Sequence, residues 1–318
     1  MKAKFVNSNR TFVLGFLSCL YIPWLRGYTV GEEDVMPIPI QFVKMHGLGN
    51  DFIIVDCLSH PYGVEQLVGQ AAALCDRHFG IGGDGLILVM PGLNAPFRMR
   101  IVNNDGSEAE MCGNGIRCFA KYVYERGLTR DTEFVVETLA GPITPVLLLE
   151  GEQVKAVRVD MGEPRLERAQ IPMTGPAGTV IDEPLAVADR TFNVTAVSMG
   201  NPHAVIFVDD VKHFPVEQYG PLIEHHPAFP RRTNVEFAQA EAPDKLTMRV
   251  WERGAGITLA CGTGACATLV AAVLSGRAER TALLTLPGGP LDITWSAEDN
   301  HVYMTGPATE AFTGTVKI

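Results

Sequence analysis

Two copies of one short motif constrain this chain more than any other feature of its sequence. The motif C-G-x-G occurs as CGNG at 112–115 and as CGTG at 261–264, and in both places it follows a β-like run. Each copy opens a stretch with the apolar spacing of a helix, 113–126 and 262–274. A repeated strand–turn–helix unit predicts two similar half-molecules that face each other across a cleft.

The rest of the chain is rich in short β-like runs. A third helix is predicted over 64–76, and 318 residues are enough for two domains. An apolar fraction of 47% and a charged fraction of 19% are ordinary for a globular protein. Strands are predicted at 52–56, 86–90, 98–102, 132–138, 144–149, 156–161, 192–198, 204–208, 234–238, 246–252, 283–286, 291–295 and 301–305.

The first forty residues differ from the remainder. Lys2, Lys4 and Arg10 precede an interrupted apolar run over 11–25, which is the layout of a secretory signal and is too short for a membrane-spanning helix of ~20 apolar residues. A targeting segment, such as a plastid transit piece, is a second interpretation. We favour a third, an extension that the folded domains do not use, joined to them by a proline-containing linker over 31–41.

Charge and cysteine content exclude several classes of protein. A net charge of −10 without a dense basic run argues against a nucleic-acid partner. Seven cysteines without a CxxC pair fit neither a disulfide scaffold nor a zinc or thioredoxin-type motif, so no metal site is expected. Free thiols favour a reducing compartment: the cytoplasm, or the plastid stroma if residues 1–40 are a transit segment. No membrane association is expected.

The chemistry of the repeated motif follows from its place at a helix start. A helix N-terminus carries about half a positive charge and several unpaired N–H groups, and glycines there let a ligand approach, so it seats an anion. The same field stabilises a neighbouring thiolate. Two facing copies would place one carboxylate between the helix ends and one carbon between Cys112 and Cys261.

A thiolate on one side of that carbon and a thiol on the other could remove a proton from one face and return it to the opposite face, with no cofactor. A single C-G-x-G is weak support, since buried cysteines are common and usually inert. Its duplication at two strand-to-helix turns favours the catalytic interpretation. The other five cysteines, at Cys19, Cys57, Cys75, Cys118 and Cys266, are predicted to be structural.

Five segments in a fixed order extend the pattern beyond these two motifs: FVKMHGLGNDF at 42–52, NNDGSE at 103–108 with MCGNG at 111–115, SMGNPH at 198–203, RTN at 232–234, and WERGAG at 251–256 leading to ACGTG at 260–264. In these segments the chain, from Phe42 to its C-terminus, resembles the diaminopimelate epimerase family. The resemblance departs at Gly85, where many members carry glutamine, which puts one accessory contact in doubt, and the first forty residues have no counterpart in the family core.

The resemblance implies a reaction and a set of site residues. The reaction would be cofactor-independent epimerisation of L,L-diaminopimelate to meso-diaminopimelate, a step of lysine biosynthesis, with Cys112 and Cys261 as acid and base. Asparagine amides and an arginine suit an amino-acid end that carries both a carboxylate and an ammonium. The remaining implied residues are Gly113, Asn114, Gly262 and Thr263 for the reacting carboxylate, Asn50, Asn103, Asn201, Asn234 and Arg253 for the distal end, and Glu252 and His203 beside the reacting centre, where they contact the ammonium or tune the thiols.

The resemblance also implies a fold and an assembly. The fold class would be α/β (α+β), with two similar domains, each a curved and mostly antiparallel sheet wrapped around a central helix, and the active site in the cleft between them. We expect an N-terminal extension over 1–40, a first domain over 41–158, a second over 159–306, and a last strand at about 307–318 that returns to the first domain. Members of the family are usually homodimers.

Two other functions stay open at this point. A proline-type racemase, or another isomerase of the same superfamily, shares paired C-G motifs, although the GLGNDF and SMGNPH segments argue against it. A protein without catalytic activity could use Cys112 and Cys261 as a switchable disulfide. Comparing turnover of diaminopimelate with turnover of proline distinguishes the epimerase from a proline-type racemase. Activity that persists when Cys112 is replaced by alanine would favour the protein with a switchable disulfide.

Overall fold

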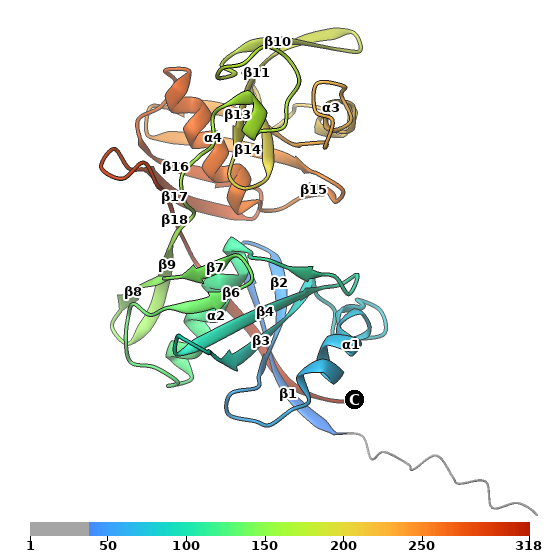
Figure 1. Cartoon of the computed structure of the whole chain (residues 1–318), viewed down its shortest axis with the longest axis vertical. Coiled ribbons are helices and arrows are strands. Elements are labelled where there is room, and N and C mark those ends of the chain that lie inside the picture. Colours follow the sequence, from blue (N-terminus) through green and yellow to red (C-terminus); the bar gives the residue numbers. More distant parts are fainter. Residues whose placement is uncertain (1–37) are drawn as a thin grey trace, which may run out of the picture. The chain divides into compact units, whose positions relative to one another are not determined.

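The computed structural model describes residues 38–318, of which Pro39–Ile318 form one compact unit (Figure 1). The expected signal, transit or extension segment therefore lies almost wholly outside the described residues. One part of that prediction is wrong, because the strand β1 begins at Pro39, inside the predicted linker. Pro39 and Ile40 pair with Lys317 and Val316. A proline is tolerated as the first residue of a strand because its missing N–H is not needed there.

Two sheets divide this unit into two lobes. The N-lobe is built on an eight-stranded sheet and the C-lobe on an eleven-stranded one. The N-lobe comprises β1 (Pro39–Gly47), β2 (Asn50–Asp56), α1 (Val64–Cys75), β3 (Gly85–Pro91), β4 (Phe97–Asn103), β5 (Glu108–Ala109), α2 (Gly113–Glu125), β6 (Val136–Thr138), β7 (Gly141–Ile143) and β19 (Thr309–Lys317).

The C-lobe follows the same style with more strands. It comprises β8 (Val146–Glu150), β9 (Gln153–Asp160), a short 3-10 turn (Arg168–Gln170), β10 (Glu183–Val187), β11 (Arg190–Ser198), β12 (Pro202–Phe207), α3 (Val216–Glu224), β13 (Asn234–Ala242), β14 (Lys245–Glu252), β15 (Gly256–Thr258), α4 (Gly262–Leu274), β16 (Thr281–Leu286), β17 (Gly289–Trp295) and β18 (Val302–Gly306).

The chain path repeats between the lobes. In the N-lobe, β1 and β2 are antiparallel, β2 and β3 are parallel across α1, β3 and β4 are antiparallel, and β4 and β6 are parallel across α2. In the C-lobe, β11, β12, α3, β13, β14, α4 and β16 follow in the same senses. The predicted architecture of two similar, mostly antiparallel domains is confirmed.

Each sheet is covered on both faces, which explains why its strands are almost continuously apolar. In β2, Phe52 and Ile54 pack with the inner helix α2, whereas Ile53 and Val55 pack with the outer helix α1. Side chains alternate between the faces of a strand, so a strand with two covered faces needs apolar residues at every position. In the C-lobe, α4 is the inner helix and α3 the outer one.

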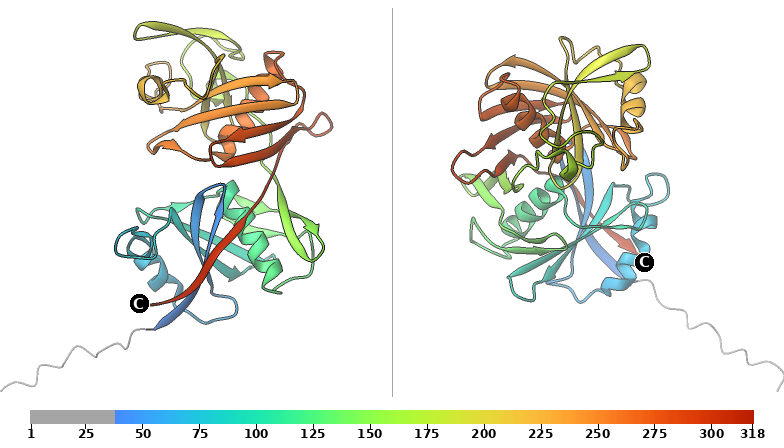
Figure 2. Two further views of the ribbon diagram at one scale, coloured as in Figure 1. Left: turned by 180° about the vertical axis from the view of Figure 1, so that it is seen from behind. Right: turned by 45° about the horizontal axis from the view of Figure 1, so that its top comes forward.

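Two segments join the lobes. The strands β8 and β9 belong to the sheet of the C-lobe, yet Leu147 and Val157 pack in the core around α2. In the other direction, β19 leaves the C-lobe and pairs antiparallel with β1, and Figure 2 shows this red strand beside the blue one. The expected boundary between residues 158 and 159 thus falls inside β9, a strand that contributes to both lobes, and its position stays a prediction.

Most predicted elements lie where the sequence placed them. The strand predicted over 132–138 is only three residues long, Val136–Thr138, and the helix α3 was not predicted. The strands β1, β5, β7, β10 and β15 were not predicted either. Within residues 38–318, no helix is long and apolar enough to cross a membrane. In the same part of the chain, no group of three or more His, Cys, Asp or Glu side chains is placed to hold a metal ion.

Candidate active site

The two motif cysteines are the N-caps of the two inner helices. Cys112 precedes α2 with φ −140° and ψ 120°, and Cys261 precedes α4 with φ −129° and ψ 107°. Both are extended residues, so the chain turns into the helix directly after the sulfur-bearing position. The predicted helix starts at Gly113 and Gly262 are confirmed to the residue.

The two helix starts converge on one side chain. A Cβ built on Gly113 would lie 2.8 Å from Met304 Cε, and one built on Gly262 would lie 3.3 Å from the same atom. Both helices therefore begin against a single methyl group, although Met304 lies on β18. Because each cysteine directly precedes one of these glycines, Cys112 and Cys261 open onto a common space.

That space is a cavity of about 1450 Å³ lined by residues of both lobes. Two of the predicted site residues, His203 and Asn234, are absent from its lining and lie buried in the C-lobe. The other predicted residues all line it: Cys112, Cys261, Asn50, Asn103, Gly113, Asn114, Asn201, Glu252, Arg253, Gly262 and Thr263.

An asparagine at the first turn of each repeat contacts the start of the inner helix. Asn50 begins β2 and accepts a hydrogen bond from Asn114 Nδ2 at 3.0 Å. Asn201 lies in the turn between β11 and β12 and donates to Thr263 Oγ1 at 3.2 Å. Asn114 and Thr263 occupy equivalent positions, two residues after the motif cysteine. The repeat therefore builds the same asparagine–helix contact twice.

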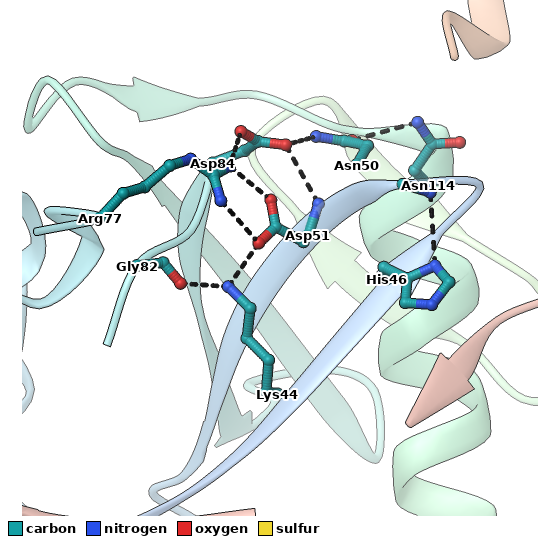
Figure 3. Close-up of polar contacts among 9 residues, drawn as sticks. Lys44, His46, Asn50, Asp51, Arg77, Gly82, Asp84 and Asn114 are labelled. Atoms are coloured by element: carbon teal, nitrogen blue, oxygen red, sulfur yellow. Dashed lines mark hydrogen bonds and ion pairs between the residues drawn. The ribbon is translucent and has the colours of Figure 1, made fainter. Parts of the chain in front are cut away.

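A network of charged groups holds Asn50 in place (Figure 3). Asn50 Nδ2 donates to Asp84 at 2.7 Å, and Arg77 bridges Asp84 and Asp51 at 2.7 Å each. Lys44, which is buried, pairs with Asp51 at 2.6 Å. Burial raises the pKa of Asp51, but the hydrogen bonds from Arg77 and Lys44 outweigh it and lower the pKa from 3.8 to about 2. Asp51 therefore stays ionised at neutral pH.

A different group stands behind Asn201. Its Oδ1 lies 3.0 Å from His203 Nε2, and His203 Nδ1 lies 2.7 Å from Glu236 Oε1. The side chains of His203 and Glu236 are both 0% exposed. The two asparagines of the repeat therefore have unlike partners: a partly exposed ionic network in the N-lobe and a buried histidine–glutamate pair in the C-lobe.

Burial raises the pKa of the Cys112 thiol. The backbone N–H groups of Gly115 and Asn114 and the charge of Arg117 act in the opposite direction. Gly115 N donates to Cys112 Sγ at 3.4 Å, as expected for a thiolate-stabilising helix N-terminus. The sulfur also lies 3.6 Å from Asn50 Oδ1, which only accepts, so this contact is made by the thiol.

Burial also raises the pKa of Cys261, to well above its usual value. The negative charges of Glu252 and Glu236 add to the effect, whereas the hydroxyl of Thr263 and the N–H of Gly264 oppose it. Cys261 Sγ lies 3.6 Å from Thr263 Oγ1, and either atom can be the donor. The two thiols therefore share a helix-start position and differ in the charges around them.

The equivalent strands β4 and β14 end in the polar residues Asn103 and Glu252. Asn103 Nδ2 donates to Ser107 Oγ at 2.9 Å. Glu252 accepts from the hydroxyl of Thr258. Burial raises the pKa of Glu252, while the hydroxyl of Thr258 lowers it and the charge of Glu236 raises it further. Glu252 is thus a half-buried carboxyl beside the thiol of Cys261.

Arg253 is exposed at the wall of the cavity. Its backbone N–H donates to Asn234 Oδ1 at 2.9 Å, and Asn234 Nδ2 donates to Pro202 O at 2.9 Å. Both ends of the Asn234 amide are thus used to hold the chain around Arg253. The guanidinium of Arg253 bonds the carbonyl of Arg231 at 3.2 Å and pairs with no carboxylate among residues 38–318.

Sequence reasoning missed several residues of the site. Asp84 and Arg77 line the cavity, and Met304 and Glu236 lie under the helix starts. Asp84 directly precedes Gly85, and Glu236 follows RTN at 232–234 by two positions. No motif in the sequence indicates that Asp84 contacts Asn50 or that Glu236 contacts His203.

The fold is shared with a class of two-lobed epimerases and related proteins. A phenazine biosynthesis protein of the PhzF family from Bacillus anthracis superposes with a TM-score of 0.66 at 15% identity, over 88% of this chain and 100% of that chain. A hydroxyproline epimerase from Agrobacterium vitis superposes with a TM-score of 0.61 at 14% identity, over 88% and 93% of the two chains. At these identities the likeness concerns the fold.

The sequence comparisons are more specific. The family model for diaminopimelate epimerase matches residues 42–167 and 195–310, and this chain belongs to that family. It is 60% identical over 275 residues to a diaminopimelate epimerase from Moorella thermoacetica, covering 86% of this chain and 98% of the relative. The diaminopimelate epimerase of Pelotomaculum thermopropionicum is 58% identical over the same length and shares.

Proposed function

We propose that this protein is a diaminopimelate epimerase that interconverts L,L- and meso-diaminopimelate in lysine biosynthesis. One observation carries the proposal: two cysteine-capped helices begin against the same Met304 side chain and open onto one cavity. The high identity to named diaminopimelate epimerases supports the choice of substrate. No cofactor takes part in the scheme.

The reacting carboxylate would bind between the two helix starts. The backbone amides of Gly113 and Asn114 on one side, and of Gly262 and Thr263 on the other, would donate to its oxygens. When the α-proton leaves, negative charge spreads onto this carboxylate, and fixed N–H donors and helix dipoles stabilise the added charge. Such stabilisation is what lowers the barrier to removing a weakly acidic proton.

The two sulfurs would then divide the proton transfer between them. The thiolate of one cysteine takes the α-proton and becomes a thiol, while the thiol of the other gives its proton to the opposite face and becomes a thiolate. No atom is lost or gained, and the configuration at carbon is inverted. The reverse reaction starts from the exchanged protonation state, so Cys112 and Cys261 trade roles with direction.

The distal end of the substrate would bind to Arg253 and to the asparagines at 50, 103 and 201. The unpaired guanidinium of Arg253 suits a carboxylate, and the amides suit a carboxylate beside an ammonium. Asn234 would contribute to this binding by holding the backbone around Arg253. His203 would contribute by its contact with the amide of Asn201. A substrate without the distal amino-acid group leaves these polar groups unpaired and is selected against.

The cavity is larger than the substrate requires. Ligand pockets usually measure about 300–1,000 Å³, and this one measures about 1450 Å³. We infer that the lobes close on the bound substrate and expel water, which strengthens the electrostatic contacts around the reacting carbon. We also expect a homodimer in the cytoplasm, where the thiols stay reduced.

The rate is expected to rise with pH through the neutral range and to peak on the alkaline side. Turnover needs one thiolate, and burial raises the pKa of both Cys112 and Cys261. Because a raised pKa keeps the thiols protonated at neutral pH, the active state becomes populated only as pH increases. Above the optimum the second thiol also ionises and the rate falls. A kcat/KM profile that declines from pH ~6 to ~8 would contradict this assignment.

Proton exchange in deuterated water tests the proposed function directly. With L,L-diaminopimelate and no added cofactor, ¹H NMR should show loss of the α-proton signal together with formation of the meso isomer. Buffer without protein is the blank, and L-proline is the second substrate arm. Exchange with L-proline and none with diaminopimelate would assign the protein to the proline racemase type instead.

A further inference from the structure

Glu236 is a buried carboxylate that the proton transfer above does not use. It lies on β13, its side chain is 0% exposed, and its Oε1 contacts His203 Nδ1 at 2.7 Å. Its other oxygen, Oε2, has no hydrogen-bond partner among residues 38–318. Burying a carboxylate oxygen without a hydrogen-bond donor costs free energy of folding, so we expect Glu236 to have a function that offsets this cost.

A continuous chain of contacts leads from Glu236 to the sulfur of Cys261. His203 Nε2 lies 3.0 Å from Asn201 Oδ1, Asn201 Nδ2 donates to Thr263 Oγ1 at 3.2 Å, and that hydroxyl lies 3.6 Å from Cys261 Sγ. Glu236 is also close to the start of α4 itself, since a Cβ built on Gly264 would meet Glu236 Oε1 at 2.7 Å. Glu236 therefore lies directly under the first turn of α4.

The hydrogen-bond directions along this chain depend on one another. Asn201 donates through Nδ2 to Thr263, so its Oδ1 faces His203, and His203 Nε2 must carry a proton to donate to it. A second proton lies in the contact between His203 Nδ1 and Glu236 Oε1. The His203–Glu236 pair thus holds two protons. Thr263 already accepts from Asn201, so its own hydrogen is free to point at Cys261 Sγ.

The opposite directions would follow if the pair held one proton. His203 Nε2 would then accept from the amide of Asn201, whose oxygen would turn to Thr263. The Thr263 hydroxyl would donate to that oxygen, and Cys261 would lose its donor. The N-lobe has no such arrangement, because Asn50 is held by Asp84 and Cys112 meets an amide oxygen.

We propose that Glu236 is a positioning residue of the Cys261 half-site. It keeps His203 doubly protonated, which sets the amide of Asn201 so that the Thr263 hydroxyl donates to Cys261 Sγ and stabilises the thiolate. The effect on turnover rests on the proposed function; the hydrogen-bond chain itself does not. The titratable groups around Cys261 are Glu252 from β14, Glu236 from β13 and His203 from β12.

Alkylation of the thiols as a function of pH, read by mass spectrometry, tests the chain without substrate. In Glu236→Gln the amide keeps its shape and accepts from His203 Nδ1, so Nε2 loses its proton and Thr263 no longer donates to Cys261. The midpoint for Cys261 should move up by about one pH unit, while that of Cys112 stays in place. A downward move would mean that Glu236 acts only by its through-space charge, and an unchanged midpoint would mean no link; either result overturns the proposal.

The wild-type protein provides a measurement that needs no variant to fold. ¹⁵N NMR of histidine-labelled protein should show hydrogens on both ring nitrogens of His203, and in Glu236→Gln the Nε2 hydrogen should be lost. A bare Nε2 in the wild-type protein refutes the proposed chain. Both readouts stand whether or not the protein turns over diaminopimelate, so they separate this inference from the proposed function.

Turnover supplies the third readout. Glu236→Gln should lower kcat about 10²-fold with little change in KM, because a small misplacement of a reacting group costs about that much. Glu236→Asp, which restores the carboxylate on a shorter arm, should recover part of the loss. Thr268→Val is the matched control: Thr268 is buried in α4 and its hydroxyl donates to Met248 Sδ, away from the chain. It should change thermal stability alone, and wild-type kcat in Glu236→Gln would count against the proposal.

Discussion

Replacing either Cys112 or Cys261 by serine is expected to reduce kcat for diaminopimelate by about 10²–10⁴-fold, the range for loss of a general acid or base. Serine is a favoured N-cap residue at both positions, and at Cys112 its hydroxyl can accept the hydrogen bond that the sulfur accepts from Gly115 N, so the helix start should persist. A hydroxyl is a far weaker acid than a thiol, so the substituted position can serve neither as the base nor as the acid, and one half of the proton transfer is lost. Steady-state kinetics in both directions, with circular dichroism as the fold check, measure the effect.

The matched control for these variants is Cys57→Ser. Cys57 is a half-buried free cysteine outside the cavity, and burial and the charge of Asp56 raise the pKa of its thiol to about 11. Wild-type turnover is expected for this variant. If Cys112→Ser or Cys261→Ser also turned over at the wild-type rate, a two-base reaction at these sulfurs would be excluded.

Replacing Arg253 by methionine is expected to lower kcat/KM for diaminopimelate by about 10²–10³-fold. The change keeps much of the side-chain length and removes the guanidinium that would bind the distal carboxylate. Losing one partner of a desolvated charge pair costs about 2–5 kcal/mol, which corresponds to a loss of this size. The loss should appear largely in KM, because the distal contact is made in the ground state as well as in the transition state.

Arg231→Met is the control for this substitution. Arg231 is a neighbouring exposed arginine that contributes its backbone carbonyl to Arg253 and does not line the cavity. Its replacement should leave the kinetic constants near wild-type values, because a backbone carbonyl survives substitution. Equal effects at both positions would indicate a general change in surface charge instead of a specific distal contact.

The two helix starts of the site could be predicted because their conformation depends on a few consecutive residues. A C-G-x-G turn specifies its own conformation: the cysteine stays extended and the glycines that follow leave room at the helix start. Both inner helices begin where the motif placed them. Strands with two covered faces can also be predicted, as at FIIV, residues 52–55, because every position there is apolar.

The parts that escaped prediction depend on distant partners. The helix α3 contains Pro221 and runs for only nine residues, so its pattern is weak on its own. The repeat explains it, since α3 stands where α1 stands in the first half. Met304 and Glu236 are ordinary strand residues until the folded chain places them under two helix starts. Their importance comes from contacts across long sequence separations, which no local window records.

The paired strands β9 and β18 carry a consequence for how the lobes can move. The chain enters the C-lobe along β9 and leaves it along β18 toward β19, and these neighbours are hydrogen-bonded in register from Val157–Gly306 to Asp160–Tyr303. The covalent tether between the halves is therefore a two-ply ribbon. Such a pair of strands can bend but resists stretching and shear, so we expect the two lobes to move by a hinge motion about it. A swing of this kind would bring the starts of α2 and α4, at Gly113 and Gly262, back to the same relative position each time the lobes close.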